Sequence, residues 1–148
     1  MQENKKVKNT RKGEYNGIQF RSHLEIICYK RLIESGFTPE YESQTFILLD
    51  KFKLTRVLFY APVKGGLKLY PRGIMSMTYT PDFYLEHKGY KILFDTKGQP
   101  NETYPLKKKL FLKQLEERSI ITNEKFIFFE PHNQKQILEA IQIIKQLE

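Results

Sequence analysis

The chain has 148 residues, 40% of them hydrophobic, which is typical of one domain with a core of its own. No apolar run is long enough to span a bilayer and the polar first residues lack the apolar segment of a signal peptide, so we expect a cytoplasmic protein without membrane contact. A single cysteine, Cys28, excludes an intramolecular disulfide bond and fits a reducing compartment.

The chain is basic, with 25 Lys and Arg against 17 Asp and Glu and a net charge of +8. Such an excess favours a polyanionic partner such as nucleic acid, because each neutralised phosphate releases counterions. A general contribution to solubility is the alternative. Residues 1–13 contain five Lys or Arg and almost nothing apolar, so we expect a basic flexible N-terminal arm followed by a single domain at 14–148.

Three segments have the apolar spacing of helices. The first begins at Ser22 and ends at Gly36, with an apolar face of Leu24, Ile27, Cys28 and Leu32. The second runs from about Pro105 to Arg118, with an inner face of Leu106, Leu110, Phe111 and Leu115. The third begins at Asn133 or Gln134, and its inner face is formed by Ile137, Ile141, Ile144 and Leu147.

Strands are predicted at residues 46–49 and 53–60, and residues 125–130 have the continuous apolar character of a buried strand. Residues 61–77 are interrupted by Pro and Gly, so we expect a hairpin or an irregular loop there. We also expect this segment to determine substrate choice or dimerisation. The resulting order predicts an α/β fold with a central mixed sheet flanked by helices.

Residues 78–97 have the pattern of a β-hairpin. A tight turn at Lys88-Gly89 would pair His87 with Tyr90 and place Asp82 opposite Asp95. Because side chains alternate along a strand, Asp95 and Lys97 share a face. Like charges that face each other across a sheet are destabilising, so this pairing makes sense if a cation lies between the carboxylates. Lys97 would then lie beside the metal, as in metal-dependent phosphodiesterases.

These residues resemble the PD-(D/E)xK nuclease signature: Pro81-Asp82, twelve intervening residues, then Asp95-Thr96-Lys97. The chain is also similar to a small phage-borne branch of that superfamily over about residues 15–115. The segments that carry this similarity are Gly17-Ile18-Gln19-Phe20-Arg21-Ser22-His23-Leu24-Glu25, Tyr79-Thr80-Pro81-Asp82-Phe83-Tyr84, Asp95-Thr96-Lys97-Gly98 and Leu106-Lys107-Lys108-Lys109-Leu110-Phe111. The resemblance implies an αβββαβ restriction-endonuclease-like core with an additional C-terminal helix.

The chemistry of hard cations gives each residue a role. Mg²⁺, or Mn²⁺ in its place, prefers oxygen ligands, which Asp82, Asp95 and the backbone carbonyl of Thr96 can supply. Lys97 would orient or deprotonate the attacking water or stabilise the developing charge. Glu25, where many members of the superfamily carry an additional acid, would complete the site.

Each residue also has a structural alternative. Glu25 lies three positions after Ser22 and can close a capping box at the start of the first helix. Asp82 can be a polar residue at a strand entrance, and Asp95 with Lys97 can form a surface ion pair. Zinc chemistry is not favoured, because the three histidines are scattered along the chain and there is only one cysteine.

Basic residues near this hairpin are the expected DNA contacts: Lys107, Lys108, Lys109, Lys113 and Arg72. A solvated helix face is the alternative for the four lysines. Together the sequence predicts a Mg²⁺-dependent endodeoxyribonuclease associated with a phage or another mobile element. A DNA-binding module without turnover and a phage scaffold or interaction protein are the alternatives. The preferred DNA structure, the number of metal ions and a homodimer are left open.

Overall fold

The computed structural model describes residues 13–70, 73–98 and 101–148. Its helices are α1 (His23–Glu34), α2 (Tyr104–Thr122) and α3 (Gln134–Lys145). Its strands are β1 (Gly13–Tyr15), β2 (Ile18–Phe20), β3 (Glu40–Tyr41), β4 (Phe46–Leu49), β5 (Tyr60–Val63), β6 (Gly66–Leu69), β7 (Met77–Tyr79), β8 (Phe83–His87), β9 (Tyr90–Phe94) and β10 (Lys125–Phe129). Residues 1–12 and Arg72, predicted as a basic arm and a DNA contact, lie outside the described residues.

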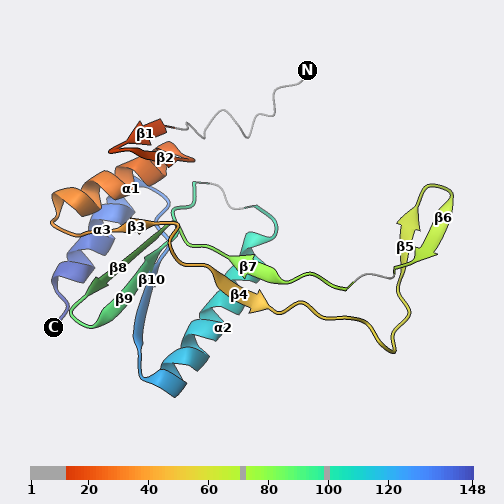
Figure 1. The fold of residues 1–148 in the computed structure, drawn as a ribbon. Helices are drawn as coiled ribbons and strands as arrows, with labels where there is room; N and C mark the ends of the chain where they lie inside the picture. Colours follow the sequence, from red (N-terminus) through yellow and green to blue (C-terminus); the bar gives the residue numbers. More distant parts are fainter. Residues whose placement is uncertain (1–12, 71–72, 99–100) are drawn as a thin grey trace.

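The central sheet has four strands in the order β10-β9-β8-β3 (Figure 1). β10 runs parallel to β9, whereas β8 is antiparallel to both of its neighbours. Parallel neighbours need a crossover connection, and α2 provides it between β9 and β10. The predicted α/β fold with a mixed sheet is confirmed.

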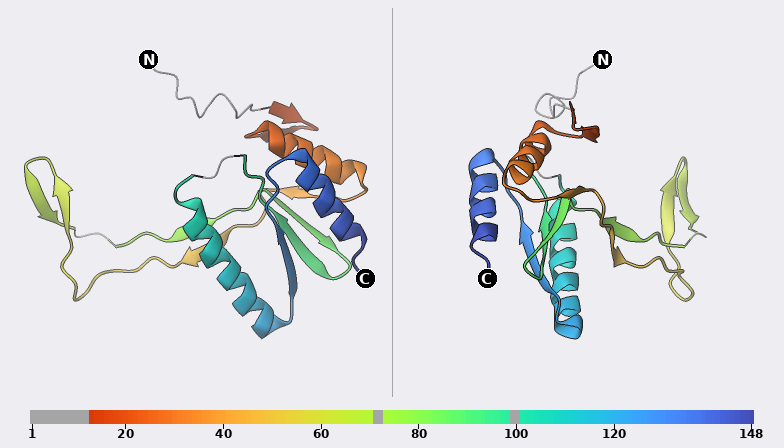
Figure 2. Two further views of the ribbon diagram at one scale, coloured as in Figure 1. Left: turned by 180° about the vertical axis from the view of Figure 1, so that it is seen from behind. Right: turned by 60° about the vertical axis from the view of Figure 1, so that its left-hand side comes forward.

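Helices cover both faces of this sheet (Figure 2). Ile92 and Phe94 of β9 belong to a core cluster that includes buried residues of α1 and α3. Leu93, between them, belongs to a second cluster with Phe111 and Leu115 of α2. Neighbouring residues of a strand point to opposite faces, so this alternation directs Asp95, two positions after Leu93, toward the side covered by α2.

The β8–β9 hairpin has the predicted register. His87 pairs with Tyr90 across the turn, and Phe83 pairs with Phe94 at the other end. Lys88 and Gly89 both have positive φ, 48° and 82°, as two-residue hairpin turns of the favoured kind require.

The predicted helix boundaries are largely confirmed. Ser22 caps α1 by accepting a hydrogen bond from the Glu25 backbone, and Gly36 follows the helix with φ of 88°. Asn133 caps α3, while α2 continues to Thr122 rather than ending at Arg118. The expectation that Leu106 lies on the inner face of α2 is wrong, because its side chain is 55% exposed. Tyr104, at the start of that helix, is buried instead.

The predicted strand at 53–60 is also wrong, since only Tyr60 belongs to a strand. Val57 and Leu58 are strongly exposed, so the apolar run does not enter the core. The hairpin expected within 61–77 is confirmed as β5–β6, with Val63 paired to Gly66. The strand at 125–130 exists as β10, but its position at an edge of the sheet leaves it half-buried.

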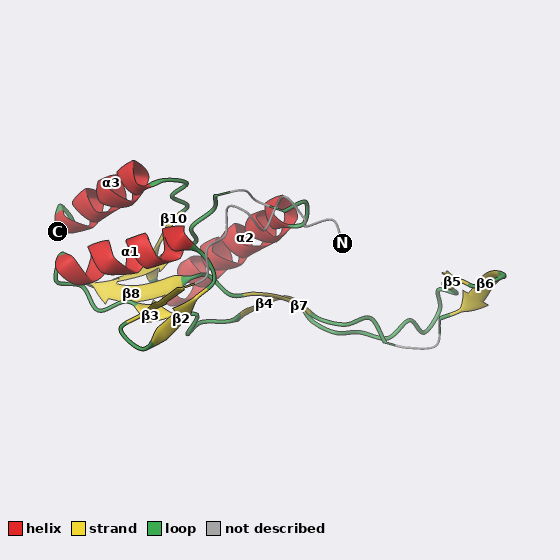
Figure 3. Ribbon diagram, turned by 90° about the horizontal axis from the view of Figure 1, so that it is seen from above, coloured by secondary structure: helices red, strands yellow, loops and turns green. Residues whose placement is uncertain are grey.

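Residues 50–70 and 73–76 lie in a long extension that we call the arm. β4 and β7 pair at its base, its two legs run side by side away from the sheet, and β5–β6 form its tip (Figures 1 and 3). Among the described residues, none of the helices has both the length and the apolar character needed to cross a membrane.

Candidate active site

Three carboxylates are buried where the β8–β9 hairpin meets the start of α1. Asp95 is 1% exposed, Glu25 7% and Asp82 8%. Asp82 comes one residue before the Phe83–Phe94 pair and Asp95 one residue after it, so the hairpin register brings the two acids together. Buried carboxylates are rare unless they are paired or bind a metal, which marks this position as a candidate site.

Asp82 is oriented by the residue that follows Asp95. Thr96 donates its backbone N–H to Asp82 Oδ2 at 2.7 Å and its hydroxyl to the same oxygen at 2.8 Å. Burial nevertheless raises the pKa of Asp82 well above its usual value, and the negative charges of Asp95 and Glu25 raise it further. The two hydrogen bonds from Thr96 therefore fix the orientation of the Asp82 carboxylate, whereas burial and the neighbouring acids destabilise its ionised form.

Asp95 has two different partners. The Tyr79 hydroxyl donates to Asp95 Oδ2, and Lys97 Nζ lies 3.2 Å from Asp95 Oδ1. Burial and the charge of Asp95 raise the pKa of Tyr79 above its usual range, which keeps this hydroxyl a hydrogen-bond donor. The ion pair with Lys97 is not a surface pair, because the Asp95 side chain is 2% exposed and that of Lys97 26%.

Glu25 lies at the cap of α1 and also lines the cleft. Its backbone N–H donates to Ser22 Oγ at 3.2 Å, as in a capping box. Its Oε2 accepts from the backbone N–H of Arg21 at 3.0 Å, one residue before the position expected for the reciprocal bond, and from the Tyr41 hydroxyl at 2.8 Å. The same side chain lines the cleft that contains Asp82.

This cleft is polar and has a volume of about 580 Å³. It brings together Asp82, Asp95, Lys97 and Glu25, four of the residues predicted from the sequence. The other residues that line it are Arg21, Glu42, Thr45, Thr78, Tyr79, Thr80, Asn101, Thr103, Tyr104 and Lys107. A strongly polar cleft with several acids and a lysine suits a charged substrate better than an apolar one.

Tyr104, the first residue of α2, also lines the cleft. Its ring lies 4.5 Å from Lys97 Nζ and 5.3 Å from Lys108 Nζ, measured to the ring centroid. Its hydroxyl donates to Glu130 Oε1 at 2.6 Å. The ring therefore stabilises the charged form of both amines by cation–π attraction. Tyr104 comes seven residues after Lys97 in the sequence, and only the tertiary fold brings its ring over Lys97 Nζ.

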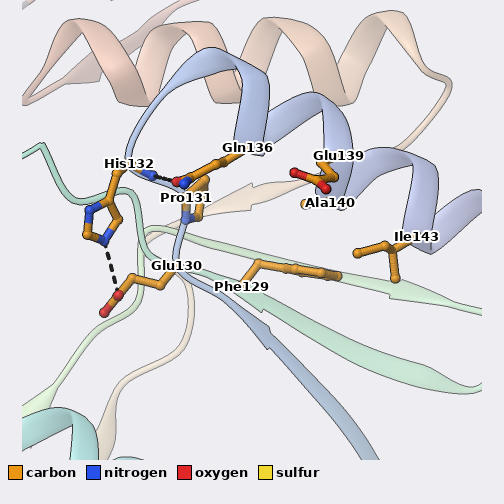
Figure 4. A pocket seen from close by; sticks show the side chains of 8 residues that line it. All are labelled: Phe129, Glu130, Pro131, His132, Gln136, Glu139, Ala140 and Ile143. Atoms are coloured by element: carbon orange, nitrogen blue, oxygen red, sulfur yellow. Dashed lines mark hydrogen bonds and ion pairs between the residues drawn. The ribbon is translucent and has the colours of Figure 1, made fainter.

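A second hollow, of about 400 Å³, lies between the end of β10 and α3, and Glu130 lines it (Figure 4). Lys108 Nζ lies 3.0 Å from its Oε1, and His132 Nε2 lies 3.1 Å from its Oε2 (Figure 4). Burial raises the pKa of Glu130, but hydrogen bonds from Tyr104, Lys108 and His132 outweigh it and lower the pKa to about 2. Both carboxylate oxygens of Glu130 therefore have partners, and Glu130 anchors Tyr104 and Lys108 beside the cleft.

The lysines of α2 have different surroundings. Lys107 lines the cleft, and Lys108 is paired with Glu130. Lys113 lies 3.6 Å from Glu117 in an exposed ion pair, and Lys109 is exposed. Lys107 is therefore the best placed of the four to meet a phosphate near the carboxylates.

The donor chemistry of the cleft fits a hard cation such as Mg²⁺, because its acids are carboxylates. Within the described ranges, however, no three His, Cys, Asp or Glu side chains are arranged so that they could hold a metal ion as they stand. Mg²⁺ usually keeps several water ligands and is bound through one or two carboxylates plus substrate phosphate. Asp82, Glu25 and Asp95 are the carboxylates in this cleft that a test of metal binding has to address.

Comparison with known families gives one match. The model of the DUF1064 family, described as proteins of unknown function, matches residues 5–127. This chain belongs to the DUF1064 family. The match covers the whole cleft and ends within β10, so α3 lies outside the part that defines DUF1064. Searches of curated proteins and of solved structures gave no match.

Proposed function

We propose that this protein is a divalent-metal-dependent endodeoxyribonuclease that hydrolyses DNA phosphodiester bonds. The observation that carries the proposal is the burial of Asp82 beside Asp95 and Glu25, with Lys97 in the same cleft. Burial and the charges of Asp95 and Glu25 oppose the ionisation of Asp82, which a bound cation would relieve, and a lysine beside these acids suits a reaction in which negative charge develops.

Asp82 and Asp95 would hold the metal ion, together with the backbone carbonyl of Thr96 and with Glu25. A bound Mg²⁺ or Mn²⁺ supplies Lewis-acid stabilisation of the scissile phosphate and a more acidic water. Thr96 keeps Asp82 Oδ2 in a fixed orientation, which leaves the other oxygen of that carboxylate to face a ligand. Tyr79 orients Asp95 in the same way.

Lys97 is the residue that we propose to act on the attacking water or on the charge of the phosphate. It is held by Asp95 on one side and by the ring of Tyr104 on the other. These two contacts restrict a long side chain, and such preorganisation lowers the entropic cost of placing Nζ beside the reacting group.

DNA is the proposed substrate because the chain is basic overall and because Arg21 and Lys107 line the cleft with the acids. Phosphate contacts from such residues would position the backbone without reading its sequence. We propose a cytoplasmic location, which fits the one buried thiol of Cys28, and association with a phage or another mobile element.

The test is cleavage of labelled linear duplex, single-stranded, flap and four-way junction DNA. Wild type and Asp82→Asn are compared in Mg²⁺, in Mn²⁺ and in EDTA. Metal-dependent cutting by wild type alone supports the proposal, and the preferred DNA gives the substrate class. Absence of cutting by wild type in both metals on all four DNAs contradicts it.

The hydrogen bonds on both oxygens of Asp95 favour a second candidate, a DNA-binding module with this cleft but without turnover. In that case DNA would bind in EDTA with an affinity that falls steeply as salt rises, and neither metal would produce cleavage.

A further inference from the structure

We propose that the arm binds a single-stranded segment of the DNA substrate, with its cations on the phosphates and an unpaired base in an apolar pocket between its two legs. This role of the arm deepens the nuclease proposal and rests on it for DNA as the ligand of the neighbouring cleft. It is carried by the charge of the arm, by exposed aromatic rings between its cations, and by a pocket that both kinds of side chain line.

The arm is strongly basic. Its described part carries five exposed cations: Lys51, Lys53, Arg56, Lys64 and Lys68. Asp50 is its only acid, and the sequence contains no further Asp or Glu before Asp82. In the described ranges, none of the five cations forms an ion pair with a carboxylate. Cations without acids beside them attract a polyanion, and each can neutralise a phosphate.

Aromatic rings lie between these cations in the sequence and are open to solvent. Phe52, Phe59 and Tyr60 are 46%, 45% and 52% exposed. Unpaired bases stack on such rings with little preference for sequence, whereas an intact duplex offers a protein only the edges of its bases. Exposed rings interleaved with cations therefore suit a single strand better than a duplex.

A pocket between the two legs of the arm combines both features. It has a volume of about 500 Å³, and Phe52, Tyr70 and Ile74 are among its apolar lining residues. Lys51 and Lys53 line it as well. An apolar pocket with two cations matches the two parts of a nucleotide, because the faces of the base are apolar and the phosphate is anionic.

Backbone hydrogen bonds hold the two sides of this pocket together. Phe52 N–H donates to the Ile74 carbonyl at 3.0 Å, and Ile74 N–H donates to the Phe52 carbonyl at 2.6 Å. Gly73 permits this close approach of the legs, since a Cβ at that position would lie 3.2 Å from the Phe52 carbonyl oxygen. The backbone of the arm therefore forms the pocket without a ligand.

The base of the arm is part of the wall of the cleft. Thr45, which precedes β4, and Thr78 of β7 both line the cleft, and the hydroxyl oxygens of Thr45 and Thr80 are 2.9 Å apart. The arm extends from there away from the central sheet (Figures 1 and 3). A DNA strand in the cleft would thus have the arm beside it. Ten extended residues span up to ~33 Å, which corresponds to about ten nucleotides at ~3.4 Å each.

A lipid surface is the competing partner for a basic segment with exposed apolar side chains. Segments that lie on a bilayer gather their apolar side chains on one face. The β5–β6 tip does not, because Val63 lies on the face opposite to Tyr60 and Leu67, and all three are exposed. The charge, the pocket and the continuity with the cleft favour a nucleic acid instead.

The test is fluorescence anisotropy of labelled DNA with the full chain in EDTA, which measures binding without cleavage. The DNAs are a blunt duplex, the same duplex with a single-stranded tail of increasing length and of either polarity, and the same tail without bases. Phe52→Leu removes a ring but keeps an apolar side chain in the pocket, and Lys51→Gln with Lys53→Gln removes two charges. Lys135→Gln with Lys145→Gln, both on exposed positions of α3, is the matched control. Thermal unfolding checks that each variant folds.

We expect the tail to strengthen binding at least ~10-fold and the gain to level off near about ten nucleotides. Phe52→Leu should weaken binding of the tailed DNA by ~5- to 30-fold and leave the tail without bases unaffected, because it removes stacking alone. The Lys51 and Lys53 double variant should weaken binding of both tails and reduce the slope of log affinity against log salt by ~1.4, or ~0.7 per phosphate contact. The α3 control should change neither quantity.

Equal affinity for blunt and tailed DNA overturns the proposal, as does an α3 control that weakens binding as much as the arm variants. Vesicles of phosphatidylserine and phosphatidylcholine in equal parts test the lipid surface. Arm variants that lose vesicle binding but keep their affinity for tailed DNA also overturn the proposal. Arm variants that behave as expected support it even if wild type cuts none of these DNAs in Mg²⁺ or Mn²⁺, an outcome that contradicts the nuclease proposal alone.

Discussion

Asp82 lies one residue before Phe83 and Asp95 one residue after Phe94, and these two phenylalanines pair across the β8–β9 hairpin. The Lys88-Gly89 turn therefore fixes the register that brings Asp82 and Asp95 together, although both lie at the other end of the hairpin. Thr96 then joins them, because it follows Asp95 in the chain and donates two hydrogen bonds to Asp82. The hairpin alone assembles the centre of the cleft.

Asp82→Asn should abolish cleavage and stabilise the metal-free protein. Asparagine can still accept both hydrogen bonds from Thr96, and it removes a buried charge that burial, Asp95 and Glu25 all disfavour. We expect the free energy of unfolding in EDTA to rise by about 1 kcal/mol, as for other stabilising changes at functional sites. Urea denaturation measures this.

Added Mg²⁺ provides the control for that prediction. A metal bound only by the folded state stabilises wild type by ~2.7 kcal/mol at one hundred times its dissociation constant. The Asp82→Asn variant should respond much less. Equal stabilisation of both proteins would contradict a metal role for Asp82.

The stability of the metal-free protein should fall as pH rises through the titration of Asp82. Its folded pKa is raised above the ordinary 3.8, so the folded state binds more protons than the unfolded state between these two values. Glu124 and Glu130, with pKa values lowered to about 2, act in the opposite direction but only below about pH 4.5. Urea midpoints in EDTA from pH 5 upward, compared with Asp82→Asn, should separate the two effects, and parallel curves would contradict the assignment.

Lys97→Met should have the opposite effect on stability. It leaves Asp95, which is 1% exposed, with the Tyr79 hydroxyl but without its cation. We expect a loss of about 1–3 kcal/mol together with loss of cleavage, because an unpaired buried charge is costly. Lys135→Met, on an exposed position of α3, is the matched control and should change neither property. A stable, active Lys97→Met protein would exclude a role for this lysine.

The parts of the fold that could be predicted are those with local signals. Ser22 and Gly36 define α1, and the Lys88-Gly89 turn defines the register of the hairpin, because capping and positive φ depend on neighbouring residues. Asp82, Asp95 and Lys97 were singled out by strand periodicity and by resemblance to a nuclease motif, and Glu25 by that resemblance; all four line one cleft. Their chemistry needs no long-range contact to be recognised.

The sequence-based predictions failed where tertiary contacts, rather than neighbouring residues, determine the structure. Val57 and Leu58 have strand propensity, but a strand forms only where a neighbour pairs with it, and both side chains are strongly exposed with no strand pairing among the described residues. Tyr79 was missed as a site residue because nothing in its own segment distinguishes it from a core tyrosine. Its contact with Asp95 comes from tertiary packing alone.

Tyr104 offers a test of positioning rather than chemistry. Tyr104→Phe keeps the ring over Lys97 and removes only the hydrogen bond to Glu130, which retains Lys108 and His132. Tyr104→Leu removes both. We expect cleavage close to wild type in the first variant and a reduction of about 5- to 30-fold in the second, since a cation–π contact is worth ~1–2 kcal/mol.

Glu25→Gln separates the structural role of this residue from its charge. The cap of α1 survives, because Ser22 Oγ accepts from the backbone N–H of residue 25. The glutamine carbonyl can also accept from Arg21 N–H and from the Tyr41 hydroxyl. We therefore expect thermal stability within ~0.5 kcal/mol of wild type and a loss of cleavage of at least ~10-fold if the charge helps to bind metal.

Tyr41 reports on the same change independently of activity. Burial, its hydrogen bond to Glu25 and the charges of Glu25 and Glu42 raise the pKa of Tyr41 above its usual value. Replacing the carboxylate of Glu25 by an amide should weaken the hydrogen bond from the Tyr41 hydroxyl, which the chemical shift of that hydroxyl proton in NMR spectra can follow. A changed Tyr41 hydroxyl signal with unchanged cleavage would show that Glu25 acts only in the fold, since its charge would then reach Tyr41 without contributing to catalysis.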